Sequence, residues 1–341
     1  MVEHRELQPA GDSGAAVAAA VVSGLSFPSC DSTHHDSPVG SALEPVLLEA
    51  CAGRLSGLSW FRTSWQRGGA ATAYALWHDD AGLPRPAVVK LPVPPVELFW
   101  LRHLQAAGDV APRLFVSDQS LGPYDLAWVL MERLEHGPLS LHWNGLEFDL
   151  AVQALGRFYV ASRSVPLPAP GPEKDWKRVC EQARRHIAED HDIAHEQRWK
   201  NALKAAQKKL GFWLSIWNAR SRTDWCHGDF QLANAMTRQP APAGPALLID
   251  YALVHPGHWI EDAVYLEHLF WARRARLGGR KLVSMIAHER HRLGLPVEPD
   301  WPLLAAVKRG LLAMSTPAML QADGDPHHVQ AALEVLEIEV K

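Results

Sequence analysis

The residues best suited to chemistry lie in one short stretch of the second half of the chain. Asp229 is followed five residues later by Asn234, and Asp250 comes directly after an apolar run. A carboxylate can orient a hydroxyl and take its proton, and carboxylate and amide oxygens are the ligands that Mg²⁺ prefers. Phosphoryl transfer from a nucleotide needs these groups and little covalent chemistry from the protein. The spacing therefore favours a tight catalytic loop that begins at Asp229, with a metal-binding carboxylate at Asp250.

The elements that must position these residues form a strand-rich first part and a helix-rich second part. Alternating and β-branched patterns predict strands, and apolar residues at helical spacing predict helices. In the first part we expect strands at 58–65, 73–77, 87–91, 114–116 and 127–131, and helices at 45–55 and 96–107. In the second part we expect helices at 147–162, 176–188, 199–218 and from 261 onward, with a strand at 246–249. This order predicts an α+β protein of two lobes, with a flexible extension over 1–40, an N-terminal lobe over 41–134 and a C-terminal lobe over 135–341.

The motif HGDFQLAN at 227–234, followed by LLID at 247–250, carries a family resemblance. It resembles the catalytic and metal motifs of the aminoglycoside phosphotransferase and choline kinase superfamily, whose members are small-molecule relatives of protein kinases. The resemblance extends from residue 58 to the C-terminal helices. It implies a two-lobed protein-kinase-like fold, ATP as co-substrate and Mg²⁺ as cofactor. It also implies Asp229 as the catalytic base, and Asn234 and Asp250 as the Mg²⁺ ligands.

Upstream residues follow the order that the resemblance implies. Lys90 lies on a short strand, where such kinases place the lysine that contacts the α- and β-phosphates, and Glu97 at the start of the next helix would pair with it. Gly68 and Gly69 could let backbone amides approach the phosphates. Each of these features also has a simpler interpretation. Lys90 could be a solvated lysine on a strand, Glu97 a charge favoured at a helix N-terminus, and Gly68-Gly69 a hairpin turn. Glu97 follows Lys90 by only seven positions, which is short for the family.

Three further parts of the resemblance concern the hinge and the support of the catalytic loop. The segment containing Met131, Glu132 and Leu134 resembles the hinge between the lobes. The backbone of Glu132 and Leu134 would bond the adenine edge, and Met131 would sit behind the base. His227 resembles the histidine that braces the loop, and Asp262 the aspartate that supports it. One departure is the sequence Gln-Leu-Ala at 231–233, where many relatives have His-Pro-Gly.

Composition limits the classes of partner and compartment. The 341 residues include 34 basic and 38 acidic side chains, a net charge of −4, so no basic excess indicates a nucleic acid or an anionic membrane. None of the four cysteines forms a C-x-x-C pair, so the chain is interpreted as cytoplasmic with free thiols. The apolar run at 15–22 is too short to span a bilayer and lacks the basic flank of a signal peptide.

These observations favour an ATP-dependent phosphotransferase acting on a small alcohol that is aminoglycoside-, choline- or sugar-like. The alternative is a catalytically inactive kinase-like protein that binds nucleotide or serves as a scaffold. Retention of Lys90, Asp229, Asn234 and Asp250 together favours the enzyme. A protein kinase is less favoured, because no long activation loop follows Asp250. The acidic stretch 323–339 leans slightly towards a cationic acceptor, and the sequence indicates neither the acceptor itself nor the oligomeric state.

Aromatic and histidine residues in the second part leave two questions open. Most of the fourteen tryptophans are expected to fill a helical core, although one or two could stack on a sugar or a quaternary ammonium. His191 and His195 share a helix face and could bind a metal, but a solvated polar face is favoured because no third ligand is evident. Cys226 is expected to be a small buried residue and not a nucleophile.

Overall fold

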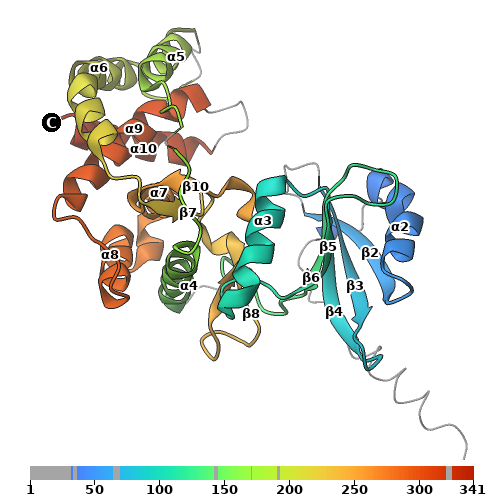
Figure 1. Cartoon of the computed structure of the whole chain (residues 1–341). Coiled ribbons are helices and arrows are strands. Elements are labelled where there is room, and N and C mark those ends of the chain that lie inside the picture. Colours follow the sequence, from blue (N-terminus) through green and yellow to red (C-terminus); the bar gives the residue numbers. More distant parts are fainter. Residues whose placement is uncertain are drawn as a thin grey trace, which may run out of the picture.

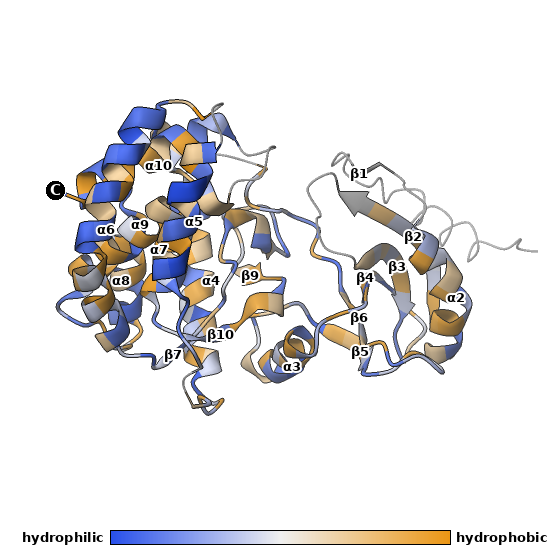
Figure 2. Cartoon of the chain, turned by 90° about the horizontal axis from the view of Figure 1, so that it is seen from above, coloured by the Kyte–Doolittle hydropathy of each residue, from blue (hydrophilic) through white to orange (hydrophobic). Residues whose placement is uncertain are grey.

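The chain folds into a strand-rich part and a helix-rich part, with helix α3 (Pro95–Leu104) lying between them (Figures 1 and 2). This is the predicted α+β architecture of two lobes. The computed structural model describes residues 32–33, 37–63, 70–141, 145–169, 171–189, 193–319 and 325–341. In those residues, no helix combines the length and the apolar character that crossing a membrane requires.

The first part is built on a six-stranded antiparallel sheet with the strand order β1-β2-β3-β4-β6-β5. In β3, buried and half-buried residues alternate, as expected for a strand with one face packed on a core. The buried side contributes Ala73 and Trp77 to a small core that also contains Leu47 of helix α2 (Pro38–Ala50). The strands are β1 (Ser32–Thr33), β2 (Leu55–Thr63), β3 (Ala71–His78), β4 (Pro84–Leu91), β5 (Leu114–Asp118) and β6 (Trp128–Glu132).

Two elements of this part lie elsewhere than predicted. The helix expected at 45–55 occupies 38–50, because Ser37 caps it by accepting a hydrogen bond from the Gly40 N–H at 3.2 Å. Helix α2 therefore takes in the last three residues of the expected extension. Strand β4 starts at Pro84, three residues before the expected start at residue 87. Pro86 lacks an N–H, yet its carbonyl still accepts a hydrogen bond from the Arg133 N–H at 3.0 Å.

The second part is mainly helical and encloses the larger core. Helices α5 and α6 each have a hydrophilic side and a hydrophobic side (Figure 2), and Trp199, Trp217 and Trp259 are fully buried. The tryptophans thus largely fill the core, as expected. The helices are α4 (Leu146–Ser162), α5 (Trp176–Glu189), α6 (Glu196–Ala219), α7 (Ile260–His268), α8 (Leu282–Arg292), α9 (Trp301–Met319) and α10 (Pro326–Glu339). Two small hairpin-like sheets pair β7 (Asp224–Cys226) with β10 (His255–Gly257) and β8 (Ala235–Thr237) with β9 (Ala246–Leu248).

Helix α3 comes from the strand-rich half of the sequence but packs in the helical core. Trp100 is 1% exposed and makes edge-to-face contacts with Phe158 and Trp225, with ring centroids 5.8 and 5.0 Å away. On the other side, the Val93 N–H in the short link before the helix bonds the Ala127 carbonyl at 2.9 Å. This link carries the chain from β4 directly to the start of α3, which sets the position of the residues described next.

Candidate active site

Lys90 lies at the centre of a three-residue ion-pair group. Strand β4 places it opposite Thr72 and Val129, and its ammonium contacts both oxygens of Glu97, at 2.7 and 2.8 Å. The same ammonium donates to Asp250 at 3.1 Å, across 160 residues of sequence. Burial alone would lower the pKa of Lys90, but the two carboxylates outweigh it and raise the pKa, so the lysine stays charged at neutral pH. The short spacing from Lys90 to Glu97 therefore allows direct pairing.

Asp250 holds an uncommon backbone conformation. Its φ and ψ angles are 64° and 69°, in the left-handed region that aspartate and asparagine tolerate better than most residues. It directly precedes the short 3₁₀ helix η3 (Tyr251–Leu253), and its side chain is 43% exposed. One carboxylate oxygen contacts Lys90, and the other makes no hydrogen bond to any described residue. An exposed oxygen of this kind can serve as a ligand to a divalent cation.

Asp229 is held far more closely than Asp250. Tyr265 of helix α7 donates its hydroxyl to Oδ1 at 2.5 Å, and Asn234 donates its amide to Oδ2 at 2.8 Å. Gln231 donates to both oxygens, at 3.0 and 3.1 Å. Burial first, and then the neighbouring Asp229, raise the pKa of Tyr265 well above its ordinary value, so its hydroxyl remains a proton donor. The carboxylate is thus fixed in direction by three side chains.

Asn234 links the Asp229 loop to Asp250. Its amide nitrogen bonds both the backbone carbonyl and the side chain of Asp229, at 2.9 and 2.8 Å, which leaves its amide oxygen available. Its backbone carbonyl accepts from the Ile249 N–H at 3.0 Å, which ties the loop to the residue before Asp250. The amide oxygen of Asn234 and the carboxylate of Asp250 form a hard, oxygen-only donor set, which fits Mg²⁺.

Asp262 bonds the backbone of the two residues that precede Asp229. Its carboxylate accepts from the backbone N–H groups of His227 at 2.8 Å and Gly228 at 2.9 Å, and from the Tyr159 hydroxyl at 2.9 Å. Burial raises the pKa of Asp262, and these donors and nearby histidines oppose the rise. Gly228 has φ +82°, and a Cβ there would lie 2.1 Å from the Leu253 carbonyl oxygen, so a side chain would not fit.

His227 is fully buried beside the loop. Its imidazole packs against the rings of Phe158 and Tyr251, at centroid distances of 5.9 and 5.3 Å, and these two rings also contact each other. Burial lowers its pKa, which favours the neutral ring. This packing places His227 where a bracing residue would lie, and not where it could reach a substrate.

The predicted hinge residues lie at the end of β6 and just beyond it. Met131 is half-buried opposite Val88, and Leu134 is buried. In the described part of the chain, the backbone N–H and carbonyl of Leu134 make no hydrogen bond, so both could bond a ligand edge. The Glu132 N–H is already bonded to the Arg113 carbonyl at 2.8 Å. The predicted phosphate turn at Gly68 and Gly69 lies outside the described residues.

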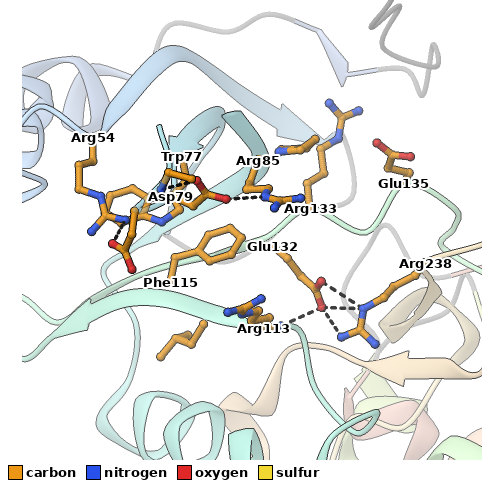
Figure 3. Close-up of a pocket in the computed structure, with 14 residues that line it drawn as sticks. Arg54, Trp77, Asp79, Arg85, Arg113, Phe115, Glu132, Arg133, Glu135 and Arg238 are labelled. Carbon is orange, nitrogen blue, oxygen red and sulfur yellow. Dashed lines mark hydrogen bonds and ion pairs between the residues drawn. The ribbon is translucent and has the colours of Figure 1, made fainter. Parts of the chain in front are cut away.

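A cavity beside the predicted hinge residues contains none of the predicted catalytic residues. It measures about 710 Å³ and is lined by β3, β4, β5 and the segment after β6 (Figure 3). The Glu132 side chain points to Arg238 there, with Nε 3.1 Å from both carboxylate oxygens, and accepts from the Arg113 N–H at 2.8 Å (Figure 3). These bonds connect β6 to the β8–β9 hairpin, so the Glu132 carboxylate is already used in contacts within the protein.

Gln231 and Tyr265 contact Asp229, and neither was selected from the sequence as a site residue. Tyr265 lies three residues after Asp262 on α7, so the helical period puts both on the loop-facing side. That spacing was the available signal. Gln231 was noted only as a departure from the usual motif, although the residue two positions after a base can readily fold back onto it.

Comparison with known proteins places this geometry in a family. Residues 66–298 match the model of the phosphotransferase enzyme family, and no curated protein matches the chain. Similar solved structures include a microcompartment-associated aminopropanol kinase, with a TM-score of 0.56, 17% identity, and coverage of 89% of this chain and 95% of that one. A putative aminoglycoside phosphotransferase from Ralstonia eutropha has a TM-score of 0.54 and 14% identity, covering 87% of this chain and 97% of that one.

Choline kinase LicA from Streptococcus pneumoniae has a TM-score of 0.51 and 13% identity, covering 87% of this chain and 99% of that one. At these identities the likeness concerns the fold, which is the protein-kinase-like fold that the sequence predicts. The family model extends over more than half of the chain and includes every described site residue from Lys90 to Asp262. The chain therefore belongs to the phosphotransferase enzyme family.

Proposed function

We propose that this protein is a small-molecule kinase that transfers the γ-phosphoryl group of Mg·ATP to the hydroxyl group of a small alcohol. The observation that carries the proposal is the contact of Lys90 with both Glu97 and Asp250, beside a loop that presents Asp229 and Asn234. A cation held between a buried carboxylate and an exposed one is suited to bind nucleotide phosphates.

On the nucleotide side, Lys90 would bond the α- and β-phosphates while Glu97 fixes the direction of its ammonium. The free backbone groups of Leu134 would bond the adenine edge, with Met131 behind the base. Asp250 and the amide oxygen of Asn234 would hold Mg²⁺. When bound there, Mg²⁺ would neutralise charge on the phosphates during transfer.

On the acceptor side, the oxygen of the acceptor hydroxyl would form a bond to the γ-phosphorus while Asp229 receives the hydroxyl proton. The bond between the γ-phosphorus and the oxygen that bridges it to the β-phosphate would break, which releases ADP. The hydroxyl must come within about 2.6–3.2 Å of the carboxylate. Gln231 and Asn234 hold that carboxylate in place, so little reorganisation is needed at the moment of transfer. Tyr265 occupies one side of Oδ1, so the acceptor must approach from another direction or displace its hydroxyl.

The test has two stages that separate binding from turnover. Saturating Mg·ATP should raise the melting temperature of the purified protein by mass action. An ATP-consumption screen should then cover amino sugars, choline-like amines, sugars, hydroxy acids and amino-acid alcohols. Asp250→Ala serves as the control in both stages, since it removes the main cation ligand. Absence of any nucleotide-induced shift would refute the proposal, and a shift without turnover on any alcohol would favour a nucleotide-binding scaffold.

A further inference from the structure

A second cavity, of about 250 Å³, lies where the start of α5, the end of α6 and the middle of α9 meet strand β10. Two tryptophans, Trp176 and Trp217, form its apolar walls, and basic side chains dominate its polar groups. A space of this size can hold a carboxylate or phosphate group and the few atoms attached to it. None of the residues assigned to nucleotide or metal binding lines it.

The charges around this cavity do not balance. Four cationic side chains face two carboxylates, Glu173 and Glu261. Arg220 uses both carboxylates, at 3.0 Å from Glu173 and 3.2 Å from Glu261, and Arg222 contacts Glu173 at 3.0 Å. Arg220 is itself nearly buried, with 4% of its side chain exposed. The two arginines therefore pair with both carboxylates, and the two lysines, Lys174 and Lys308, are left without a carboxylate in this cavity.

Lys174 and Lys308 have aromatic neighbours in place of acidic partners. The Lys308 ammonium lies 4.9 Å from the Trp217 ring centroid and 5.7 Å from that of Trp176. The Lys174 ammonium lies 4.7 Å from the Trp176 centroid. Among the described residues, no carboxylate lies within ion-pairing distance of either lysine. Lys174 is exposed and Lys308 is half-buried, so the ammonium of Lys308 is the one that loses hydration, and a cation over a ring gains only about 0.5–2 kcal/mol.

The titration of the neighbouring groups agrees with an excess of positive charge. Burial lowers the pKa of Lys308; Glu261 opposes that shift, while Arg220 and Lys174 add to it by repulsion. Burial alone would raise the pKa of Glu261, but the His255 imidazole 3.8 Å away and the nearby Lys308 and Arg220 hold it at about 2. A bound anion would relieve the repulsion between these cations.

The cavity adjoins the catalytic loop through two of its lining residues. His255 Nδ1 lies 3.0 Å from the position that a Cβ on Gly228 would take, one residue before Asp229. Glu261 directly precedes Asp262, which bonds the backbone of the loop. A molecule seated in the cavity is thus close to the loop that presents the proposed base.

We propose that this cavity binds the anionic group, a carboxylate or a phosphate, of the acceptor alcohol. The inference rests on the proposed function, since it names the class of acceptor for that same site. Cys226, His255 and Glu261 could together supply three ligands to a metal. However, Glu261 is already bonded to Arg220 and lies beside Lys308, so the charges favour an anion over a cation.

Binding is tested by calorimetry on the full chain with Mg²⁺ and a non-hydrolysable ATP analogue at saturation, so that the nucleotide site is filled. Inorganic phosphate and glycolate are the probes, which separates phosphate from carboxylate recognition. Lys308→Gln should weaken binding of the preferred probe by about 10-fold or more, the effect of one hydrogen bond to a charged group. Lys308→Arg should retain most of the affinity. Lys204→Gln, which removes the same charge from the exposed face of α6, should have no effect.

Lys174→Gln provides a second variant, because Lys174 also has an aromatic neighbour in place of a carboxylate partner. It should weaken binding of the same probe, and it keeps the test available if Lys308→Gln does not fold. Turnover is then compared for hydroxy acids, hydroxyalkyl phosphates and cationic amino alcohols. Faster consumption of ATP with an anionic acceptor, lost in Lys308→Gln, supports the inference. The inference is overturned if neither probe binds the wild-type protein, or if both probes bind wild type and Lys308→Gln equally well. Turnover restricted to cationic alcohols would also overturn it. Loss of nucleotide binding itself would instead refute the proposed function.

Discussion

The two carboxylates of the candidate active site, Asp250 and Asp229, are held in opposite ways. Asp250 is 43% exposed, with one oxygen on Lys90 and the other without a protein donor in the described chain. Asp229 accepts hydrogen bonds from Gln231, Asn234 and Tyr265 on both oxygens. A cation ligand must keep an oxygen free, whereas a base must keep its direction. The difference in their bonding therefore indicates different tasks for the same functional group.

Removal of the Asp250 carboxylate should have the largest effect. Asp250→Ala is expected to bring turnover below detection, because the phosphate-bound cation loses its main anchor. The stabilisation of the protein by Mg·ATP should fall with it, while the unliganded protein stays folded, since 43% of this side chain is exposed. Steady-state kinetics and thermal shifts on one preparation would measure both. Unchanged turnover would remove Asp250 from the site.

Asp229→Asn should come next, with a kcat lower by about 10²–10⁴, the usual contribution of a positioned acid or base. The amide keeps the size of the side chain but cannot take a proton. Stabilisation by Mg·ATP should persist, which would separate the two carboxylates experimentally. If Asp229 only braced the loop, the melting temperature would fall in proportion to activity, and near-normal kcat would exclude this residue as the base.

Tyr265→Phe tests the close hold on Asp229 and should have a smaller effect. The change deletes one hydroxyl that donates to Oδ1 and leaves the ring in place. A hydrogen bond to a charged group is worth about 1.5–3 kcal/mol, so kcat should fall by about 10-fold or somewhat more, with KM for ATP unchanged. A rise in kcat would show instead that the Tyr265 hydroxyl obstructs the approach of the acceptor to Asp229.

Glu261→Gln is expected to leave nucleotide binding intact and to change the pH dependence of stability. The folded pKa of about 2 lies below the ordinary 4.5, so the charged carboxylate contributes up to about 3 kcal/mol above pH 4.5. This contribution declines as pH falls towards 2. Denaturant unfolding should show a deficit for the variant at pH 7 that shrinks near pH 3. Glu49→Gln, on the exposed side of α2, is the control and should show no such trend.

Asp229 and Asn234 lie in contact, as their spacing in the motif predicts, because the motif residues are close in the chain. The sequence also predicted the pairing of Lys90 with Glu97, which a short link brings together. The contact of Lys90 with Asp250 spans 160 residues and depends on how β4 meets the helical part, so only the resemblance could suggest it. The contact of the Tyr265 hydroxyl with Asp229 depends on which face α7 turns towards the loop. The helical period indicates that face but does not identify Asp229 as the partner.

Charge counting along the chain gave less information about the acceptor. The acidic stretch 323–339 leaned towards a cationic acceptor, but Glu337 pairs with Arg198 at 2.7 Å and Asp325 caps α10. The cations that surround the small cavity come from separate elements, with Lys174 before α5, Arg220 after α6 and Lys308 within α9. No single stretch of the sequence contains this excess of positive charge, so the excess forms only when the chain folds.

The packing of α3 has a mechanical consequence for the ion-pair group at Lys90. Trp100 packs this helix into the helical core, so Glu97 is attached to the part of the chain that also carries Asp250, whereas Lys90 lies on a strand of the sheet. One ammonium therefore joins two carboxylates of the helical part to the sheet. Withdrawal of Lys90 would leave two acidic groups without their shared counter-charge, so this ion-pair group opposes separation of the strand from the helix.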